Sequence, residues 1–225
     1  MSQPENYWLG KWGRGRSGGG RIVGVLGIAI LVAITINTAL TKPNGATGIP
    51  PGQRLAPFAV PLALSDLEGD ANVATHARDG SAGEKPACSV RGARIFNVCQ
   101  LYEQGPVVLA LFVDSGSCPG ILDDMQKLEP SFPGVRFAAV AIKGDRGQLR
   151  GLVRSRGLTF PVGIDKDGAL AVLYKVASCP QVSFAYPGGV VQSKALLLRP
   201  SIATLRARIA ELLTAARARG WRGPA

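Results

Sequence analysis

Residues 160–191 read FPVGIDKDGALAVLYKVASCPQVSFAYPGGVV and carry the most specific structural signals in the chain. Residues 160–168 predict a short strand that runs into an Asp-Gly turn, and residues 169–175 predict a short helix. Two further strands, over 181–185 and 190–198, are expected to form a hairpin around a Pro-Gly-Gly turn. A strand, a helix and a closing hairpin in this order indicate a sheet that gains antiparallel strands towards the end of the chain.

Upstream of this stretch, strands alternate with helices. Residues 107–113, VVLALFV, form a continuous apolar run that is typical of a central strand buried on both faces, and residues 135–142, VRFAAVAI, form a second such run. We expect a helix from about Pro119 between them, a short basic helix over 147–156 after them, and a last helix from about Ser201. The resulting order, βαβαβαββα, predicts an α/β fold with a central mixed sheet flanked by helices.

The helix after Pro119 has an apolar face and a charged face. Ile121, Met125 and Leu128 recur at helical spacing and are expected to be buried. We expect the opposite face of this helix to be exposed to solvent; it carries Asp123, Asp124 and Lys127.

The net charge of +11 is concentrated near the two ends of the chain. Six arginines lie from residue 199 onward, with Glu211 as the acidic residue among them. Proteins that bind nucleic acid place lysine and arginine among aromatic side chains on one face, whereas aromatic residues make up 6% of this chain and do not interleave with these arginines. We therefore expect no nucleic-acid partner, and basic faces that are solvated or lie against anionic lipid.

Residues 22–40, IVGVLGIAILVAITINTAL, are 19 residues without a charged side chain. At 1.5 Å per residue they span about 28 Å, close to the thickness of the hydrocarbon core of a bilayer. Residues 1–21 precede them as a basic tail, which the positive-inside rule places in the cytoplasm. A cleaved signal peptide is the alternative, but the apolar run is longer than a usual secretory core and no clear Ala-x-Ala site follows it. We predict an uncleaved single-pass anchor in the cell membrane, with the C-terminal domain outside the cytoplasm.

Composition divides the rest of the chain. Residues 41–54 are rich in proline and glycine and predict a flexible linker. The folded domain is expected over 55–218, with a loop insertion at about 65–87, and residues 219–225 form a C-terminal tail. His76, the sole histidine, falls in the insertion, so no histidine-based metal cluster can form elsewhere. The sequence has no glycine-rich dinucleotide fingerprint, and we expect neither a metal nor a cofactor.

The same motifs carry a resemblance to a known family. The segments GPVVLALF, a cysteine that opens a helix, FPVGIDKDGALAVLYKV and CPQVSFAYPGGVV follow the order and spacing of the thioredoxin-like redoxin superfamily. The resemblance covers about residues 55–215, and its most specific part is the run from Phe160 to Val191. Within the superfamily, the sequence is most similar to membrane-anchored thiol–disulfide oxidoreductases of the TlpA-like, cytochrome-maturation type and to AhpC/TSA-type peroxiredoxins. The resemblance implies a thioredoxin-like fold and an activity in thiol–disulfide chemistry.

The resemblance also implies a site, with one departure. The family carries a Cys-x-x-Cys motif at the start of the first helix; Cys118 takes the place of its first cysteine, but Ile121 stands at the second, and Ser117 replaces the usual tryptophan. The family's cis-proline corresponds to Pro180, in a loop that faces the nucleophile. The fold then brings Cys179, which precedes that proline, close to Cys118. We predict a two-cysteine redox site in which Cys118 is the nucleophile and Cys179 the resolving thiol.

The position of Cys118 favours reactivity, because the N-terminus of a helix stabilises a thiolate. A static cross-link or an inert buried thiol is the alternative. Peroxide reduction is a second candidate activity: Ser115 fills the hydroxyl position of the peroxiredoxin loop, but Leu111 stands where that loop has proline, and the activating arginine has no clear counterpart. A third hypothesis is a non-catalytic binding module, which the missing motif cysteine favours.

The remaining cysteines, Cys88 and Cys99, bracket the segment SVRGARIFNV, which predicts two strands around Gly92. Four cysteines in an exported domain favour pairing, and we predict a structural disulfide between these two, with two free thiols as the alternative. The partners that we expect are a protein thiol or disulfide as substrate, an upstream redox partner that supplies electrons, and the membrane through residues 22–40.

Overall fold

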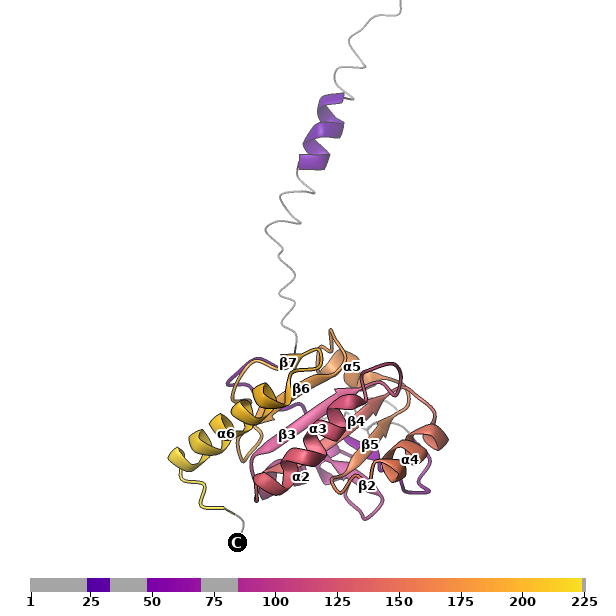
Figure 1. Ribbon diagram of the computed structural model, residues 1–225. Coiled ribbons are helices and arrows are strands. Elements are labelled where there is room, and N and C mark those ends of the chain that lie inside the picture. The colour runs from indigo at the N-terminus through magenta and orange to yellow at the C-terminus, as the bar shows by residue number, and fades with distance from the viewer. Residues whose placement is uncertain (1–23, 33–47, 70–84, 224–225) are drawn as a thin grey trace, which may run out of the picture. The chain divides into compact units, whose positions relative to one another are not determined.

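The computed structural model describes residues 24–32, 48–69 and 85–223 of the 225-residue chain (Figure 1). The chain divides into two units, Met1–Gly45 and Ala46–Ala225. In the first unit, residues 24–32 form a helix whose large aliphatic side chains are exposed: Val25, Leu26, Ile28, Ile30, Leu31 and Val32.

The predicted membrane span, residues 22–40, extends past both ends of this helix and so lies partly outside the described residues. Among the residues that the structure describes, no helix has both the length and the apolar character needed to cross a membrane. The predicted basic tail, 1–21, and residues 41–47 of the predicted linker also lie outside the described residues. The anchor therefore stays a prediction from the sequence.

A five-stranded sheet forms the centre of the second unit, and its strands are β3 (Val107–Phe112), β4 (Arg136–Ile142), β5 (Val162–Asp165), β6 (Gln181–Ala185) and β7 (Leu196–Leu197). Their order in the sheet is β5-β4-β3-β6-β7 (Figure 1). β3, β4 and β5 run parallel, whereas β6 pairs antiparallel with β3, and β7 pairs antiparallel with β6. All six residues of the central strand, β3, are buried, because both faces of the sheet are covered.

The helices are α2 (Val98–Gln104), α3 (Gly120–Leu128), α4 (Arg146–Ser155), α5 (Ala169–Leu173) and α6 (Ile202–Ala218), and a short 3-10 helix, η2 (Glu129–Ser131), follows α3. The side chains of β3 alternate between two apolar clusters, as the pleat of a strand requires. Every second residue from Val108 packs with residues of α3, α4 and α6, and every second residue from Val107 packs with residues of α2 and α5. These clusters, called here the α3 face and the α2 face, therefore lie on opposite sides of the sheet.

From β3 onward the elements follow the predicted order, βαβαβαββα, so the α/β fold with a central mixed sheet flanked by helices is confirmed. The strand expected over 190–198 is shorter than predicted: β7 pairs with β6 over two residues, and Val191 forms an isolated bridge to Ala185. The turn between them requires glycine, because Gly188 and Gly189 have φ values of 83° and 84°, in the left-handed region.

Of the two strands predicted around Gly92 within residues 88–99, the structure forms the second and not the first. The 3-10 helix η1 (Ala87–Ser89) comes first, then β2 (Ile95–Asn97), which pairs antiparallel with β1 (Ala59–Pro61), and α2 follows directly. Asn97 explains this path. Its side-chain oxygen accepts a hydrogen bond from the Cys99 N–H at 2.8 Å and caps α2, while its amide donates to two backbone carbonyls of the η1 segment at 2.8 and 2.7 Å. One buried side chain thus holds η1 against the start of α2.

The packed region begins earlier in the chain than the predicted domain boundary. The Gly48 N–H donates to the Lys175 carbonyl at 3.1 Å, just after α5. The Gly52 N–H donates to the Val191 carbonyl at 2.9 Å, between β6 and β7. Residues 48–54, predicted as the end of a flexible linker, are therefore bound to the domain, because their backbone groups find hydrogen-bond partners on it.

The predicted loop insertion is described at its two ends. Residues 70–84, which include His76, lie outside the described residues. Before this gap, the Arg150 side chain from α4 donates a hydrogen bond to the Ser65 carbonyl. After the gap, Ala87 is buried at the start of η1.

Candidate functional site

Both predicted cysteine pairs are joined as disulfides. In the first pair, the Cα atoms of Cys118 and Cys179 are 5.5 Å apart. In the second pair, the Cα atoms of Cys88 and Cys99 are 5.4 Å apart. Both separations are ordinary for a disulfide. The first pair packs with the α3 face and the second with the α2 face, so the sheet separates the two disulfides.

The order of the strands brings Cys118 and Cys179 together. β3 and β6 are antiparallel neighbours, with Leu111 opposite Gln181. Cys118 follows β3 in the chain and Cys179 precedes β6, so both cysteines come to the same edge of the sheet. The peptide bond between Cys179 and Pro180 is cis, and Pro180 is buried.

The two sulfur atoms of this site have different surroundings. Cys118 directly precedes Pro119, the N-cap residue of α3, and is 5% exposed. Cys179 is partly exposed. Unpaired N–H groups and the dipole at the start of α3 favour a thiolate at Cys118, whereas exposure favours access from outside to Cys179.

One backbone N–H lies within hydrogen-bond distance of both sulfur atoms. The Val113 N–H, one residue after β3, donates to Cys179 Sγ at 3.1 Å and to Cys118 Sγ at 3.4 Å. A hydrogen-bond donor strengthens its interaction with sulfur when that sulfur becomes a thiolate. The same donor can therefore stabilise a negative charge on either cysteine after reduction.

The sequence predicted that Asp124 lies on a solvent-exposed face of α3. In the structure it is instead buried under Arg199. Arg199 Nε and Nη2 donate to Asp124 Oδ2 at 3.1 and 3.0 Å, and Asp124 is 7% exposed. The Arg199 guanidinium also lies against Gly120, where a Cβ would come within 2.6 Å of Nη1. Helical spacing assigned Asp124 to the polar face correctly, but it could not reveal that the segment after β7 covers that face.

A second arginine contacts the first turn of α3. Arg156, directly after α4, donates from Nη1 to the Pro119 carbonyl at 2.8 Å and to Asp123 Oδ2 at 2.7 Å. Sequence reasoning missed both arginines, since Arg156 and Arg199 stand 33 and 75 residues from the aspartates that they bind. Spacing in the sequence holds no signal for pairs so far apart.

Asp114 is a further carboxylate in the segment that leads to Cys118. A Cβ on Gly144 would lie 3.0 Å from each of its side-chain oxygens, so the two residues are in close contact. Its Oδ2 is buried and has no hydrogen-bond partner among the described residues. The two residues compared with the peroxiredoxin loop differ in position: Ser115 is exposed, and Leu111 is fully buried in the α2 face.

The chain was compared with known protein families, curated proteins and solved structures. No family model and no curated protein matches the sequence. Among solved structures, the putative thiol:disulfide interchange protein DsbE from Chlorobium tepidum is 16% identical, with a TM-score of 0.54 over 75% of this chain and 98% of its own. A putative protein disulfide isomerase from Bacteroides thetaiotaomicron is 14% identical, with a TM-score of 0.53 over 75% of this chain and 94% of its own. The peroxidoxin BcpB from Mycobacterium tuberculosis is 14% identical, with a TM-score of 0.52 over 76% of this chain and 97% of its own.

This chain has a thioredoxin-like fold. At such identities the likeness is one of fold, and it includes structures named for disulfide exchange as well as one named for peroxide chemistry.

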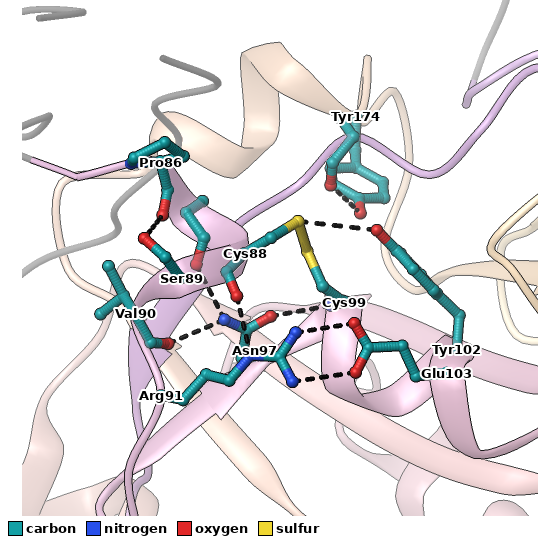
Figure 2. Close-up of a disulfide and its surroundings, with 12 residues drawn as sticks. Pro86, Cys88, Ser89, Val90, Arg91, Asn97, Cys99, Tyr102, Glu103 and Tyr174 are labelled. Atoms are coloured by element: carbon teal, nitrogen blue, oxygen red, sulfur yellow. Dashed lines mark hydrogen bonds and ion pairs between the residues drawn. A yellow bond between two sulfur atoms is a disulfide. The ribbon is translucent and has the colours of Figure 1, made fainter. Parts of the chain in front are cut away.

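Figure 2 shows the second disulfide of the thioredoxin-like domain, between Cys88 of η1 and Cys99 of α2. Cys99 is 1% exposed. The Cys88 Sγ lies 3.6 Å from the Tyr102 hydroxyl, one turn further along α2. Beside it, Arg91 and Glu103 form a two-pronged ion pair at 2.9 and 2.7 Å. These contacts join the η1 segment to α2 around the disulfide.

Two tyrosines on the α2 face border this disulfide (Figure 2). Burial raises the pKa of Tyr102, and it raises the pKa of the fully buried Tyr174 well above the usual range. The Tyr174 hydroxyl donates to the Ala56 carbonyl at 2.7 Å. Both side chains therefore stay neutral at physiological pH and act in packing and hydrogen bonding.

Proposed function

We propose that this protein is a membrane-anchored thiol–disulfide oxidoreductase that acts outside the cytoplasm. The observation that carries the proposal is the disulfide between Cys118 and Cys179, which lies at the start of α3, beside a cis-proline, with the Val113 N–H donated to both sulfurs. A pair so placed needs no Cys-x-x-Cys motif to cycle between dithiol and disulfide. Pro180, which directly follows Cys179, is buried and offers no N–H of its own.

The reaction in the reducing direction has two steps. The Cys118 thiolate attacks one sulfur of a substrate disulfide, which forms a mixed disulfide and releases the other substrate sulfur as a thiolate. The Cys179 thiolate then attacks Cys118 Sγ, which forms the internal disulfide and releases the second substrate thiol. Two electrons pass from the protein to the substrate, and a dithiol of an upstream redox partner restores the reduced site by the reverse exchange.

The anchor is supported by the sequence and by the character of the helix over 24–32. The run over 22–40 has no charge and follows a basic tail. The large aliphatic side chains of that helix are exposed, and lipid is the surrounding that would bury them all. A protease added to intact cells or spheroplasts should digest the C-terminal domain and leave the N-terminal tail protected; a protected domain would contradict the proposed orientation.

The activity is tested on the full chain in detergent. Non-reducing peptide mapping at increasing dithiothreitol should show the Cys118–Cys179 link opening before the Cys88–Cys99 link, and the reduced chain should reduce insulin disulfides. The variant C179S should accumulate a mixed disulfide with substrate at Cys118. If the mixed disulfide forms instead in C118S, at Cys179, the two roles are exchanged, as the exposure of Cys179 would favour.

The competing functions give different results in the same preparation. Consumption of hydrogen peroxide that depends on Cys118, without reduction of insulin, would replace the oxidoreductase by a thiol peroxidase. A Cys118–Cys179 link that resists dithiothreitol, with neither activity, would leave a non-catalytic binding module. The variant with both Cys88 and Cys99 replaced by alanine is the matched control for C118S and C179S. Like them it lacks one disulfide, but it keeps the proposed site.

A further inference from the structure

We infer that Arg156 and Arg199, called here the arginine pair, position the N-terminal turn of α3 and hold positive charge beside Cys118 when the site is reduced. This inference rests on the proposed function and assigns two positioning residues to it. Neither residue lies in the segments that carry the cysteines, and neither belongs to a motif of the sequence.

The two arginines bind α3 on adjacent sides, Arg156 by hydrogen bonds to a carbonyl and a carboxylate and Arg199 by packing on Gly120 and hydrogen bonds to a carboxylate. Arg156 spans from the Pro119 carbonyl to the Asp123 carboxylate. Arg199 spans from Gly120 to the Asp124 carboxylate. Each arginine thus bridges residues i and i+4, one helical turn, and the second bridge is displaced from the first by one residue, or about 100° around the helix axis. The first turn of α3 is held from two directions.

The polarity of both bridges is the same. The contacts with Pro119 and Gly120 lie directly after Cys118, whereas the two aspartates lie about one turn further along the helix. Each guanidinium therefore reaches from its aspartate back to a residue that follows Cys118 closely in the chain, so the cation extends towards the start of α3. This arrangement adds to the helix dipole, whose positive end is also at the start of α3.

Other charges near α3 do not duplicate this arrangement. Asp114, in the segment before Cys118, lies against Gly144, and its buried Oδ2 has no hydrogen-bond partner among the described residues. Lys127 is exposed in the last turn of α3, at the opposite end of the helix from the site. On α6, the Arg206 guanidinium lies 6.0 Å over the Phe132 ring, beyond the C-terminal end of α3.

The segment that carries Arg199 also contacts the second cysteine. The Leu198 N–H donates to Ser178 Oγ at 3.1 Å, and Ser178 directly precedes Cys179. Residues 198 and 199 therefore join the segment of Cys179 to the helix of Cys118. This connection keeps the two thiols aligned once the disulfide between them is open.

The test measures the pH midpoint of alkylation of Cys118 in the full chain, by iodoacetamide labelling and peptide mass spectrometry. A C179S background leaves Cys118 as the single thiol of the site, while Cys88 and Cys99 stay oxidised. The variants Arg156→Gln and Arg199→Gln should each raise the midpoint by about half a pH unit or more, because positive charge is lost beside the thiolate. Asp124→Asn should lower it, because the charge of Arg199 is no longer neutralised.

Opposite shifts for the two partners of one ion pair separate a charge effect from a structural one. If Arg199→Gln and Asp124→Asn move the midpoint in the same direction, or leave it unchanged, the inference is wrong. Arg199→Lys, which keeps the charge, should keep the midpoint close to the wild-type value. Arg217→Gln is the matched control: it removes an arginine from the far end of α6 and should not move the midpoint.

Two measures keep the outcome decisive. If circular dichroism shows that Arg199→Gln does not fold, the direction of the shift in Asp124→Asn decides alone, since that variant keeps the arginine pair. The alkylation midpoint needs no substrate, so it is independent of insulin reduction. A chain that fails to reduce insulin but shows the opposite shifts would contradict the proposed function and still support the arginine pair.

Discussion

Replacing Cys88 and Cys99 together by alanine removes the disulfide of the α2 face and leaves the Cys118–Cys179 pair in place. The two cysteines are 11 residues apart, and in the chain-entropy model a cross-link of that length stabilises the fold by about 2.8 kcal/mol. With a urea dependence of about 2 kcal/mol per molar, the midpoint of unfolding should fall by about 1.4 M. The turnover of insulin disulfides without urea should not change, because the sheet separates the two disulfides.

The assay is urea unfolding of the oxidised full chain in a non-ionic detergent, followed by far-ultraviolet circular dichroism. The variant that lacks Cys118 and Cys179 is the reference. The Cys118–Cys179 disulfide joins residues 61 positions apart, so its loss should lower the unfolding free energy by about 4.3 kcal/mol and abolish turnover. If the midpoint of the Cys88/Cys99 variant moves by less than about 0.3 M, the link is not a structural staple. If its turnover falls with its stability, the two disulfides are coupled and the separation by the sheet does not insulate them.

Burial raises the pKa of Asp165 to about 7. Between about pH 4 and pH 7 this carboxyl is therefore protonated in the folded chain but ionised in the unfolded chain. The stabilisation that results is fully present below about pH 4 and is lost as the pH rises to about 7. Relative to Asp165→Asn, the wild type should therefore lose about 1.4 kcal/mol of unfolding free energy per pH unit in urea titrations between about pH 4.5 and 6.5, and parallel curves would contradict this assignment. Gly120→Ala puts a Cβ within 2.6 Å of the Arg199 guanidinium and should displace it, raising the alkylation midpoint of the site thiol as Arg199→Gln does, with a change in stability below about 1 kcal/mol; an unchanged midpoint would show that this contact is not needed. Tyr102→Phe removes a hydroxyl 3.6 Å from the second disulfide and should cost about 0.5 kcal/mol in urea unfolding without a change in turnover, whereas lost turnover would mean that this disulfide takes part in the reaction.

The central sheet could be predicted because its strands are continuous apolar runs. β3 and β4 are buried along almost their whole length, and such runs differ clearly from the mixed sequence of α3 and α4. β1 has three residues and no such run. The residues after Gly92 indicate the three-residue strand β2, but not its pairing with β1, which lies more than 30 positions earlier in the chain. Residues 88–99 contain several β-branched and aromatic side chains, which suggested strands, but the capping contacts of Asn97 decided the local path.

The sequence could likewise suggest some residues of the candidate site and not others. Cys118, Cys179 and Pro180 could be proposed from the sequence, because a resemblance in ordered motifs places them at one edge of the sheet. Arg156 and Arg199 could not be proposed. Arg156 lies at the end of α4 and Arg199 lies between β7 and α6, and each binds a partner far away in the sequence. Contacts of this kind depend on tertiary packing, which neither periodicity nor spacing encodes.

The Val113 N–H has a consequence for how this site tolerates substitution. Because the donor belongs to the backbone, every amino acid except proline at position 113 supplies it. Saturation mutagenesis there would report on the packing of the side chain and would stay silent about the hydrogen bond, with proline as the one informative variant. The group that touches both sulfur atoms is thus retained with any residue other than proline that selection or design places at that position.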